Sequence, residues 1–233
     1  RGLAAALAAA VLSACTTSAD RPPEDLAVPH ASGTEVLAAV PQKTVVLDLA
    51  TLDTLHALGA GTVTGVPAAP LPAFLSAYED ESRYPRVGSL FEPDYEEVNA
   101  SQPDLVIVGG RSAAVYGELA RMAPTIDVTF GGDFYESLQT NTRLLATIFD
   151  KEAEAEAALA EIDAKIVALR DQVAAGGDGL VVMVNGGSLS VLAPATARAA
   201  RGMLLYQTLG LKPSVEEVEA ATHGEPISFE FLL

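Results

Sequence analysis

The sequence has little cysteine, tryptophan and positive charge, and each shortage excludes a class of protein. Its single cysteine, Cys15, allows no disulfide within the chain. Its 14 Lys and Arg residues are outnumbered by 31 Asp and Glu residues, which gives a formal net charge of −17 at pH 7. A surface this acidic repels a phosphate backbone, so we expect no nucleic-acid partner. Any anionic ligand must instead be bound by a few local cations.

Residues for metal binding and catalysis are also scarce. Three histidines are too few for a receptor that holds a bare zinc or manganese ion through several His or carboxylate ligands. The sequence contains neither the phosphate-binding G-x-x-x-x-G-K-[ST] loop nor the G-x-S-x-G nucleophile motif. We therefore expect a binding protein rather than an enzyme, with no cofactor of its own. An α/β enzyme whose site is completed beyond Leu233 stays open as an alternative.

Long apolar runs are confined to the N-terminal segment. Residues 2–14 are apolar but too short to span a bilayer. They end in Leu-Ser-Ala-Cys, which is similar to a bacterial lipobox, where a leucine and two small residues precede a lipidated cysteine. We expect residues 1–15 to be a lipoprotein signal segment and the polar, proline-containing residues 16–33 to be a linker. Lipidated Cys15 would anchor the protein on the periplasmic or extracytoplasmic face of a membrane. A core helix ending in a buried cysteine is the alternative.

Residues 34–150 predict a lobe of alternating strands and helices. Apolar runs rich in β-branched residues alternate with segments of helical periodicity at short intervals. This order is typical of α/β units with a mostly parallel sheet, whose ligand pockets lie beyond the carboxyl ends of the strands. The expected strands lie within residues 44–50, 62–67, 103–110 and 125–130, and the expected helices within residues 51–59, 92–102 and 137–149.

Residues 151–175 predict one long helix, because their apolar positions recur every three or four residues on a single face. These positions are Leu159, Ile162, Ile166, Leu169 and Val173. A second α/β lobe follows over residues 176–233, with two strands around the Asn-Gly-Gly turn at 185–187. This lobe is small for an independent core. Because its last apolar run has no partner, we expect the sequence to be truncated at both ends, with an incomplete second lobe.

Four segments together resemble the iron–siderophore-binding lipoproteins of bacterial ABC importers, most of all the group that binds catecholates such as petrobactin. They are VVLDLATLDTLHALG at 45–59, VGSLFEPDYEEVNASQPDLVIVGGR at 87–111, VNGGSLSVLAP at 184–194 and THGEPISFE at 222–230. The resemblance implies a class III periplasmic-binding fold, with two Rossmann-like lobes joined by one rigid helix. It also implies a monomer that holds a ferric siderophore between the lobes and delivers it to a permease with its ATPase. A cobalamin or haem receptor of the same fold is the alternative, although aromatic residues are few.

The resemblance also implies ligand residues, and the chemistry of the complex agrees with them. Fe(III) prefers oxygen donors, and its siderophore complexes are usually anions that a planar guanidinium binds well. Arg111 follows a predicted strand, and Arg201 precedes a predicted helix. Arg198 is an alternative to Arg201, because the family's usual motif is replaced here by ATARAARGM. Tyr116 is a candidate for stacking on a catechol. Surface positions are the alternative for Arg111 and Tyr116.

His223 lies in a His-Gly turn where the family has a histidine. The resemblance implies that it can bind siderophore iron directly where the siderophore leaves a coordination position open. A histidine that only caps the turn is the alternative. For His30, in the expected linker, and His56, in an expected helix, we predict structural roles.

Two acidic residues match exposed glutamates of the resembled family, one in each lobe. They are Glu96, for which Glu97 is a nearby substitute, and Glu230. The resemblance implies that each pairs with a permease arginine. The alternative is that they are acids favoured at the start of a helix by its dipole.

Overall fold

The first lobe is built on a four-stranded parallel sheet, as the sequence predicts. In this computed structural model, which describes residues 25–60, 62–192, 200–215 and 224–232, the strand order is β4-β3-β5-β6. Strand β5 has four fully buried residues, which a strand covered on both faces requires. The four strands are β3 (Thr44–Val46), β4 (Val63–Gly65), β5 (Leu105–Val108) and β6 (Thr125–Asp127).

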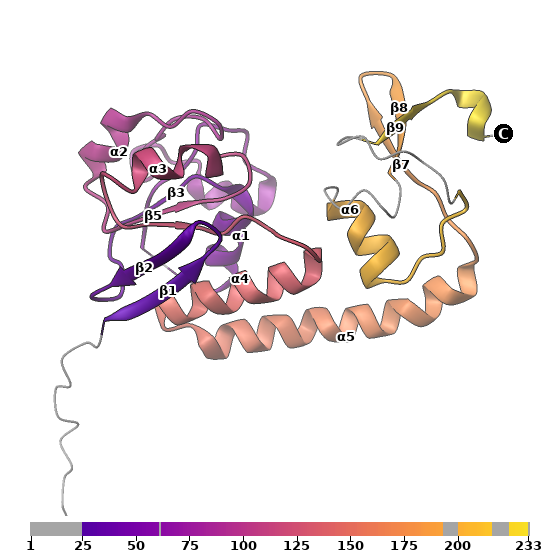
Figure 1. Ribbon diagram of the computed structural model, residues 1–233, viewed down its shortest axis with the longest axis horizontal. Coiled ribbons are helices and arrows are strands. Elements are labelled where there is room, and N and C mark those ends of the chain that lie inside the picture. The colour runs from indigo at the N-terminus through magenta and orange to yellow at the C-terminus, as the bar shows by residue number, and fades with distance from the viewer. Residues whose placement is uncertain (1–24, 61, 193–199, 216–223, 233) are drawn as a thin grey trace, which may run out of the picture.

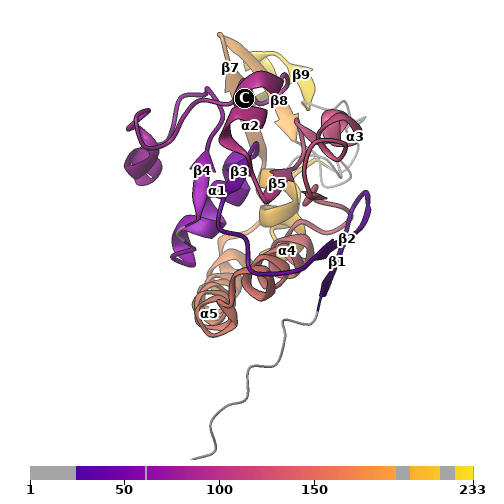
Figure 2. The same cartoon turned by 90° about the vertical axis from the view of Figure 1, so that its left-hand side faces the viewer.

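Helices cover both faces of this sheet. Side chains alternate along the strands, so Val46 joins the apolar cluster beneath α1 and α4, whereas Val45 joins the cluster beneath α2 and α3. Figure 2 shows α4 on one side of the sheet and α2 and α3 on the other. The helical segments of the lobe are α1 (Leu49–Ala57), η1 (Ala73–Tyr78), α2 (Tyr95–Ser101), η2 (Ala113–Val115), α3 (Tyr116–Leu119) and α4 (Phe134–Phe149).

Aspartate residues fix where three of these helices begin. The carboxylates of Asp48, Asp94 and Asp133 accept hydrogen bonds from backbone N–H groups in the first turns of α1, α2 and α4. These N–H groups have no partner within the helix, so each cap satisfies donors that would otherwise remain unpaired.

A β-hairpin replaces part of the expected linker. Strands β1 (Leu26–His30) and β2 (Gly33–Leu37) pair antiparallel around a two-residue turn. Val28 is 1% exposed and belongs to the core cluster of the first lobe. The expectation of a linker over residues 16–33 is therefore wrong for residues 26–33. The polar, proline-containing residues 16–25 indicated a tether that was extended too far along the chain. Pro29 lies in the hairpin, at the edge of a sheet, where proline is tolerated.

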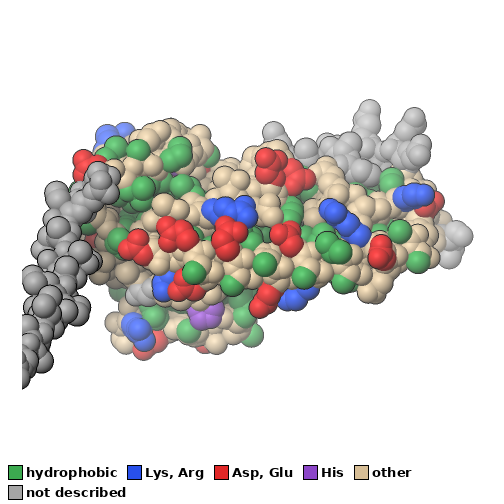
Figure 3. All heavy atoms as spheres, turned by 90° about the horizontal axis from the view of Figure 1, so that it is seen from below, with side chains coloured by type: hydrophobic (Ala, Val, Ile, Leu, Met, Phe, Trp, Pro, Cys, Tyr) green, Lys and Arg blue, Asp and Glu red, His purple; other side chains and the backbone are tan. Residues whose placement is uncertain are grey.

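The long helix α5 spans Glu152–Gly176 and joins the two lobes (Figure 1). Its N-terminal half packs along α4, where Arg143 Nε lies 2.7 Å from Glu156 Oε1 and the hydroxyl of Tyr135 donates to Asp163 Oδ1 over 2.7 Å. Leu159 and Ile166 are buried as predicted, but Leu169 is 41% exposed because α5 has passed the end of α4. Seen from below, acidic side chains outnumber basic ones on the face of the molecule that α5 contributes to (Figure 3).

The described part of the second lobe contains a three-stranded sheet in the order β7-β8-β9. Gly186 and Gly187, with φ of 57° and 85°, form the predicted turn between β7 (Val181–Asn185) and β8 (Ser188–Leu192). Both pairings are antiparallel, so the expected mostly parallel sheet applies to the first lobe and not to these strands. A two-residue turn can join only antiparallel neighbours. The remaining elements are α6 (Ala200–Gly202), the π-helix η3 (Met203–Thr208), β9 (Glu225–Ile227) and η4 (Phe229–Leu232).

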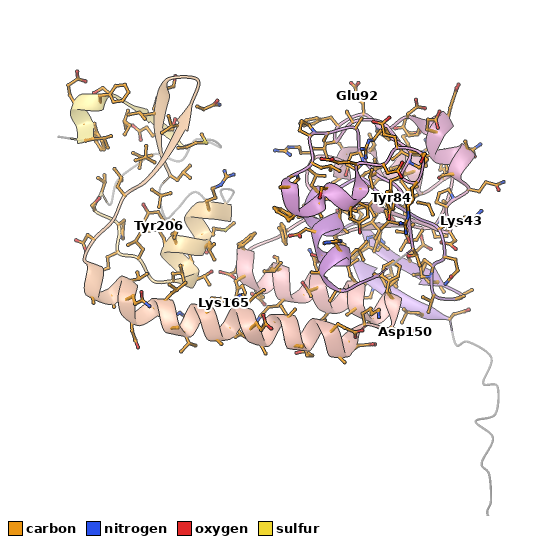
Figure 4. All side chains as sticks on the ribbon, turned by 180° about the vertical axis from the view of Figure 1, so that it is seen from behind. Lys43, Tyr84, Glu92, Asp150, Lys165 and Tyr206 are labelled. Carbon is orange, nitrogen blue, oxygen red and sulfur yellow. The ribbon has the colours of Figure 1, made fainter. Side chains whose placement is uncertain are left out.

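Two hydrogen bonds hold η3 in place between α5 and this sheet. The hydroxyl of Tyr206, which lies inside the second lobe in Figure 4, accepts from the backbone N–H of Val181 over 2.9 Å. Arg170 Nε of α5 donates to the carbonyl oxygen of Thr208, also over 2.9 Å. The second lobe is therefore fixed to the C-terminal half of α5, because the long side chain of Arg170 reaches the backbone of η3.

Candidate functional site

The carboxyl ends of β3 and β5 meet at a loop whose centre is a buried hydroxyl. Ser112 is completely buried, and its Oγ accepts from the N–H of Gly109 over 3.1 Å. The same hydroxyl lies 3.0 Å from the carbonyl oxygen of Leu47, to which it donates. Because Leu47 directly follows β3, this bond fixes the loop of residues 109–112 across two neighbouring strands. Arg111 is part of this loop.

A second set of hydrogen bonds joins the same loop to β6 and to the hairpin. The N–H of Gly110 donates to Thr129 Oγ1 over 2.9 Å, and that hydroxyl donates to Asp127 Oδ1 over 2.5 Å. The other oxygen of Asp127 accepts from the hydroxyl of Ser32 over 2.7 Å. Gly110 has a φ of +54°, a conformation that side chains with a Cβ rarely adopt. The backbone on both sides of Arg111 is therefore held from several directions.

The side chain of Arg111 leaves this rigid loop and is exposed. Its Cζ lies 5.8 Å from the centroid of the Phe91 ring. No carboxylate within the described ranges forms an ion pair with it. A free guanidinium at the carboxyl edge of a parallel sheet is a suitable group for an anionic ligand.

Of the other predicted ligand residues, the structure describes Arg201 and Tyr116. Arg201 is exposed on α6, which lies on the side of the second lobe that faces the first (Figure 1). Tyr116 is half-buried and packs on the apolar cluster around Val45, with its ring centroid 5.4 Å from that of His30. These contacts favour a packing role for Tyr116. Arg198, His223 and Cys15 lie outside the residues that the structure describes.

The predicted docking glutamates are exposed, one in each lobe. Glu96 and Glu97 lie in the first turn of α2, where Asp94 Oδ1 accepts from both of their N–H groups. Glu230 lies in η4, and a hydrogen bond with the side chain of Ser228 lowers the pKa of its carboxyl group. Both α2 and η4 lie at the ends of the lobes that point away from α5 (Figure 1), and Glu92 marks this end of the first lobe in Figure 4.

A hollow of the first lobe lies between the hairpin turn and the start of α4. It has a volume of about 530 Å³, and its charged lining residues include Asp127, Asp133 and Glu136. No Lys or Arg lines it, so it does not suit an anion. Across the described ranges, no group of three His, Cys, Asp or Glu side chains could hold a metal ion. Nor does any helix there have the length and apolar character needed to cross a bilayer.

His30 has the structural role that the sequence predicts, but it lies at the end of β1 and not in a linker. Its Nδ1 accepts from the N–H of Ser32 over 3.2 Å, so the hydrogen lies on Nε2. This Nε2 is buried without a hydrogen-bond partner among the described residues. His56 is exposed at the end of α1, with its ring 5.7 Å from that of Tyr78.

Sequence reasoning missed three contributors to this site. Ser112 and Thr129 position the Arg111 loop, and Phe91 lies against the guanidinium itself. The signal for Phe91 was its place in Ser-Leu-Phe-Glu-Pro, where an aromatic residue lies in a turn that precedes a helix. Hydroxyl residues just after predicted strands gave no comparable signal, because such positions are common in every α/β protein.

Comparison with known proteins shows which family the chain belongs to. Residues 44–233 match the model of the family described as periplasmic binding protein. The petrobactin-binding protein YclQ of Bacillus subtilis (strain 168) is 34% identical over 98% of this chain and 74% of its own length. A TroA-like periplasmic binding protein from Xylanimonas cellulosilytica is 45% identical with a TM-score of 0.78, covering 86% of this chain and 67% of that one. The periplasmic catecholate-siderophore binding protein VctP from Vibrio cholerae is 30% identical with a TM-score of 0.78, over 90% and 74%.

We predict that His30 makes the stability of the protein depend on pH below neutrality. Burial lowers the pKa of His30, against the opposing charges of Asp127 and Glu35. Between the ordinary value of about 6.5 and this lower folded value, the unfolded chain binds more protons, so stability falls as the pH falls. Urea unfolding at pH 7.5 and 5.5 should show a smaller loss for His30→Asn than for the wild type. His56→Asn is the control for the removal of a histidine as such. Equal losses in all three proteins would contradict the prediction.

Proposed function

This chain belongs to the periplasmic binding protein family, and we propose that it is the substrate-binding component of an ABC importer that captures a ferric siderophore. The observation that carries the proposal is Arg111, an exposed guanidinium with no carboxylate partner in the described ranges, on a rigid loop at the carboxyl edge of the first lobe's sheet. Fe(III) would arrive inside the siderophore as part of the cargo. The names of the similar proteins YclQ and VctP support a catecholate-type ligand.

The ligand would lie between the lobes, with cations contributed from each. Arg111 would contribute the cation of the first lobe. Arg201, or Arg198 in its place, would contribute the cation of the second lobe, whose α6 lies on the side that faces the first lobe (Figure 1). Arginine suits this task better than lysine because its planar fork can donate two parallel hydrogen bonds to neighbouring catecholate oxygens. In a chain with a net charge of −17, such local cations also attract an anion that the rest of the surface repels.

Delivery of the ligand would require the protein to bind the permease, and each lobe offers one exposed glutamate for this contact. We infer that Glu96 and Glu230 bind permease arginines, because both are exposed and lie at the same end of the two lobes. Transport assays on Glu96→Lys and Glu230→Lys, with Glu161→Lys on α5 as the control, would refute this role if all three transported equally.

We also propose that Cys15 carries the lipid anchor. Mass spectrometry showing an unacylated mature protein in its host would contradict that.

We predict that Arg111→Ala weakens binding of a ferric catecholate by about 1.5–3 kcal/mol, the usual range for hydrogen bonds to charged groups. This corresponds to roughly a 10- to 150-fold increase in Kd. The chain has six tyrosines and no tryptophan, so quenching of tyrosine fluorescence during titration is a suitable measurement. Arg83→Ala is a matched control, since Arg83 is also exposed and also lies over an aromatic ring, that of Tyr84. An equal change of Kd in both variants would mean that the effect comes from the lost net charge and not from the position of Arg111.

The metal-ligand role of His223 is tested by the denticity of the siderophore. A tetradentate siderophore leaves coordination positions of Fe(III) open, whereas a hexadentate one fills them all. His223→Ala in the full-length protein should therefore raise the Kd of a tetradentate ferric complex and leave that of a hexadentate complex nearly unchanged. A histidine that only caps its turn would give equal changes for the two complexes, together with lower stability.

A further inference from the structure

We propose that Phe91 is a positioning residue that holds the guanidinium of Arg111 ready for an anionic ligand, an inference that rests on the proposed function. Arg111 Cζ lies 5.8 Å from the centroid of the Phe91 ring, within the range of a cation–π interaction. The two residues come from different segments, the turn before α2 and the loop after β5. Their contact therefore joins these two segments, and the guanidinium that makes the contact is also the group that would bind the ligand.

The turn that carries Phe91 is rigid. Ser89 Oγ accepts from the N–H groups of Phe91 and Glu92, at 3.2 and 2.9 Å, and the N–H of Ser89 donates to the carbonyl oxygen of Glu92 over 2.8 Å. Gly88 precedes the turn with a φ of +95°, and a Cβ there would lie 2.2 Å from the backbone nitrogen of Asp94. Only glycine permits this close approach. The backbone of Phe91 thus has little freedom to move away from Arg111.

Phe91 attracts the guanidinium without offering it a hydrogen-bond acceptor. A cation–π contact acts on the charge of the group, whereas catecholate oxygens would accept from its five N–H donors. Phe91 can therefore restrain Arg111 without neutralising it. A carboxylate would occupy donors and cancel the charge.

Arg143 shows the contrasting arrangement on the same protein. Its Nε and Nη2 both donate to Glu156, at 2.7 and 3.2 Å, so its charge is paired and two of its donors are used within the protein. This bond joins α4 to α5 and leaves the group poorly suited to an external anion. The acidic composition of the chain makes a carboxylate partner easy to find, so the pairing of Arg111 with a neutral ring preserves a positive charge where the ligand would bind.

The first experiment tests positioning without any ligand. The side-chain NMR signals of Arg111 should be displaced by the ring current of Phe91 in the wild type, and this displacement should disappear in Phe91→Leu. Phe74→Leu is the matched control, because Phe74 is exposed to a similar extent, 61% against 63%, in the separate segment η1. Arg111 signals that do not respond to Phe91→Leu would overturn the inference.

The second experiment is a double-mutant cycle with a ferric tris-catecholate as the probe. Phe91→Leu should raise its Kd about two- to fivefold, the effect of losing an exposed cation–π contact. Phe91→Trp should retain wild-type affinity, and Phe74→Leu should not change it. In the Arg111→Ala background, Phe91→Leu should have no further effect. An undiminished effect there would mean that Phe91 touches the ligand directly, which contradicts positioning. Failure of the wild type to bind any ferric siderophore would reject the proposed function, while the NMR experiment would still decide the role of Phe91.

Discussion

The pairing of β5 with β3 in the first lobe determines where Arg111, the candidate ligand residue of that lobe, lies. The two strands are parallel and in register from Thr44 opposite Leu105 to Val46 opposite Ile107, so their carboxyl ends stop at the same level. The buried hydroxyl of Ser112 then joins the loop after one strand to the backbone after the other. Arg111 can remain exposed and still be well placed, because the hydrogen bonds of the loop restrain the backbone on both sides of it.

The long helix sets the distance between the two lobes and limits how they can move. A helix of the length of α5, 25 residues, extends about 37 Å and does not bend easily without a break in its hydrogen bonds. One half is bonded to α4 through Glu156 and Asp163, and the other half is bonded to η3 through Arg170. A ligand between the lobes would thus meet two surfaces at a nearly fixed separation, and recognition would depend on side chains more than on large closure.

Patterns that depend on local periodicity were predictable from the sequence. The buried run of β5, the helix α5 and the glycine turn between β7 and β8 each follow from neighbouring residues alone, and the structure confirms them. Of the predicted apolar face of α5, Leu159 and Ile166 are buried, whereas Leu169 is exposed. The hairpin at residues 26–37 was missed, because its stability comes from docking on β6, a contact between residues nearly 100 positions apart, as the bond from Ser32 to Asp127 shows. Tyr116 and Phe91 illustrate the same limit for the site. Both are aromatic residues near turns, and only the fold turns one toward the core and the other toward a guanidinium.

The hairpin also protects the outer strand of the parallel sheet from unwanted pairing. Strand β6 is at the end of the strand order, so one side of its backbone would otherwise be free to add a strand from another molecule. The N–H of Thr125 instead donates to the carboxylate of Glu35, and the carbonyl oxygen of Asp127 accepts from Ala31. The exposed partner on this side is thus the hairpin, whose strand β1 contains Pro29 and whose strand β2 has Glu35 as a charged residue. Glu35 occupies the free side of β6, and proline disfavours edge-to-edge association, so the segment that completes the site's network also leaves the sheet with an edge poorly suited to pairing with another molecule.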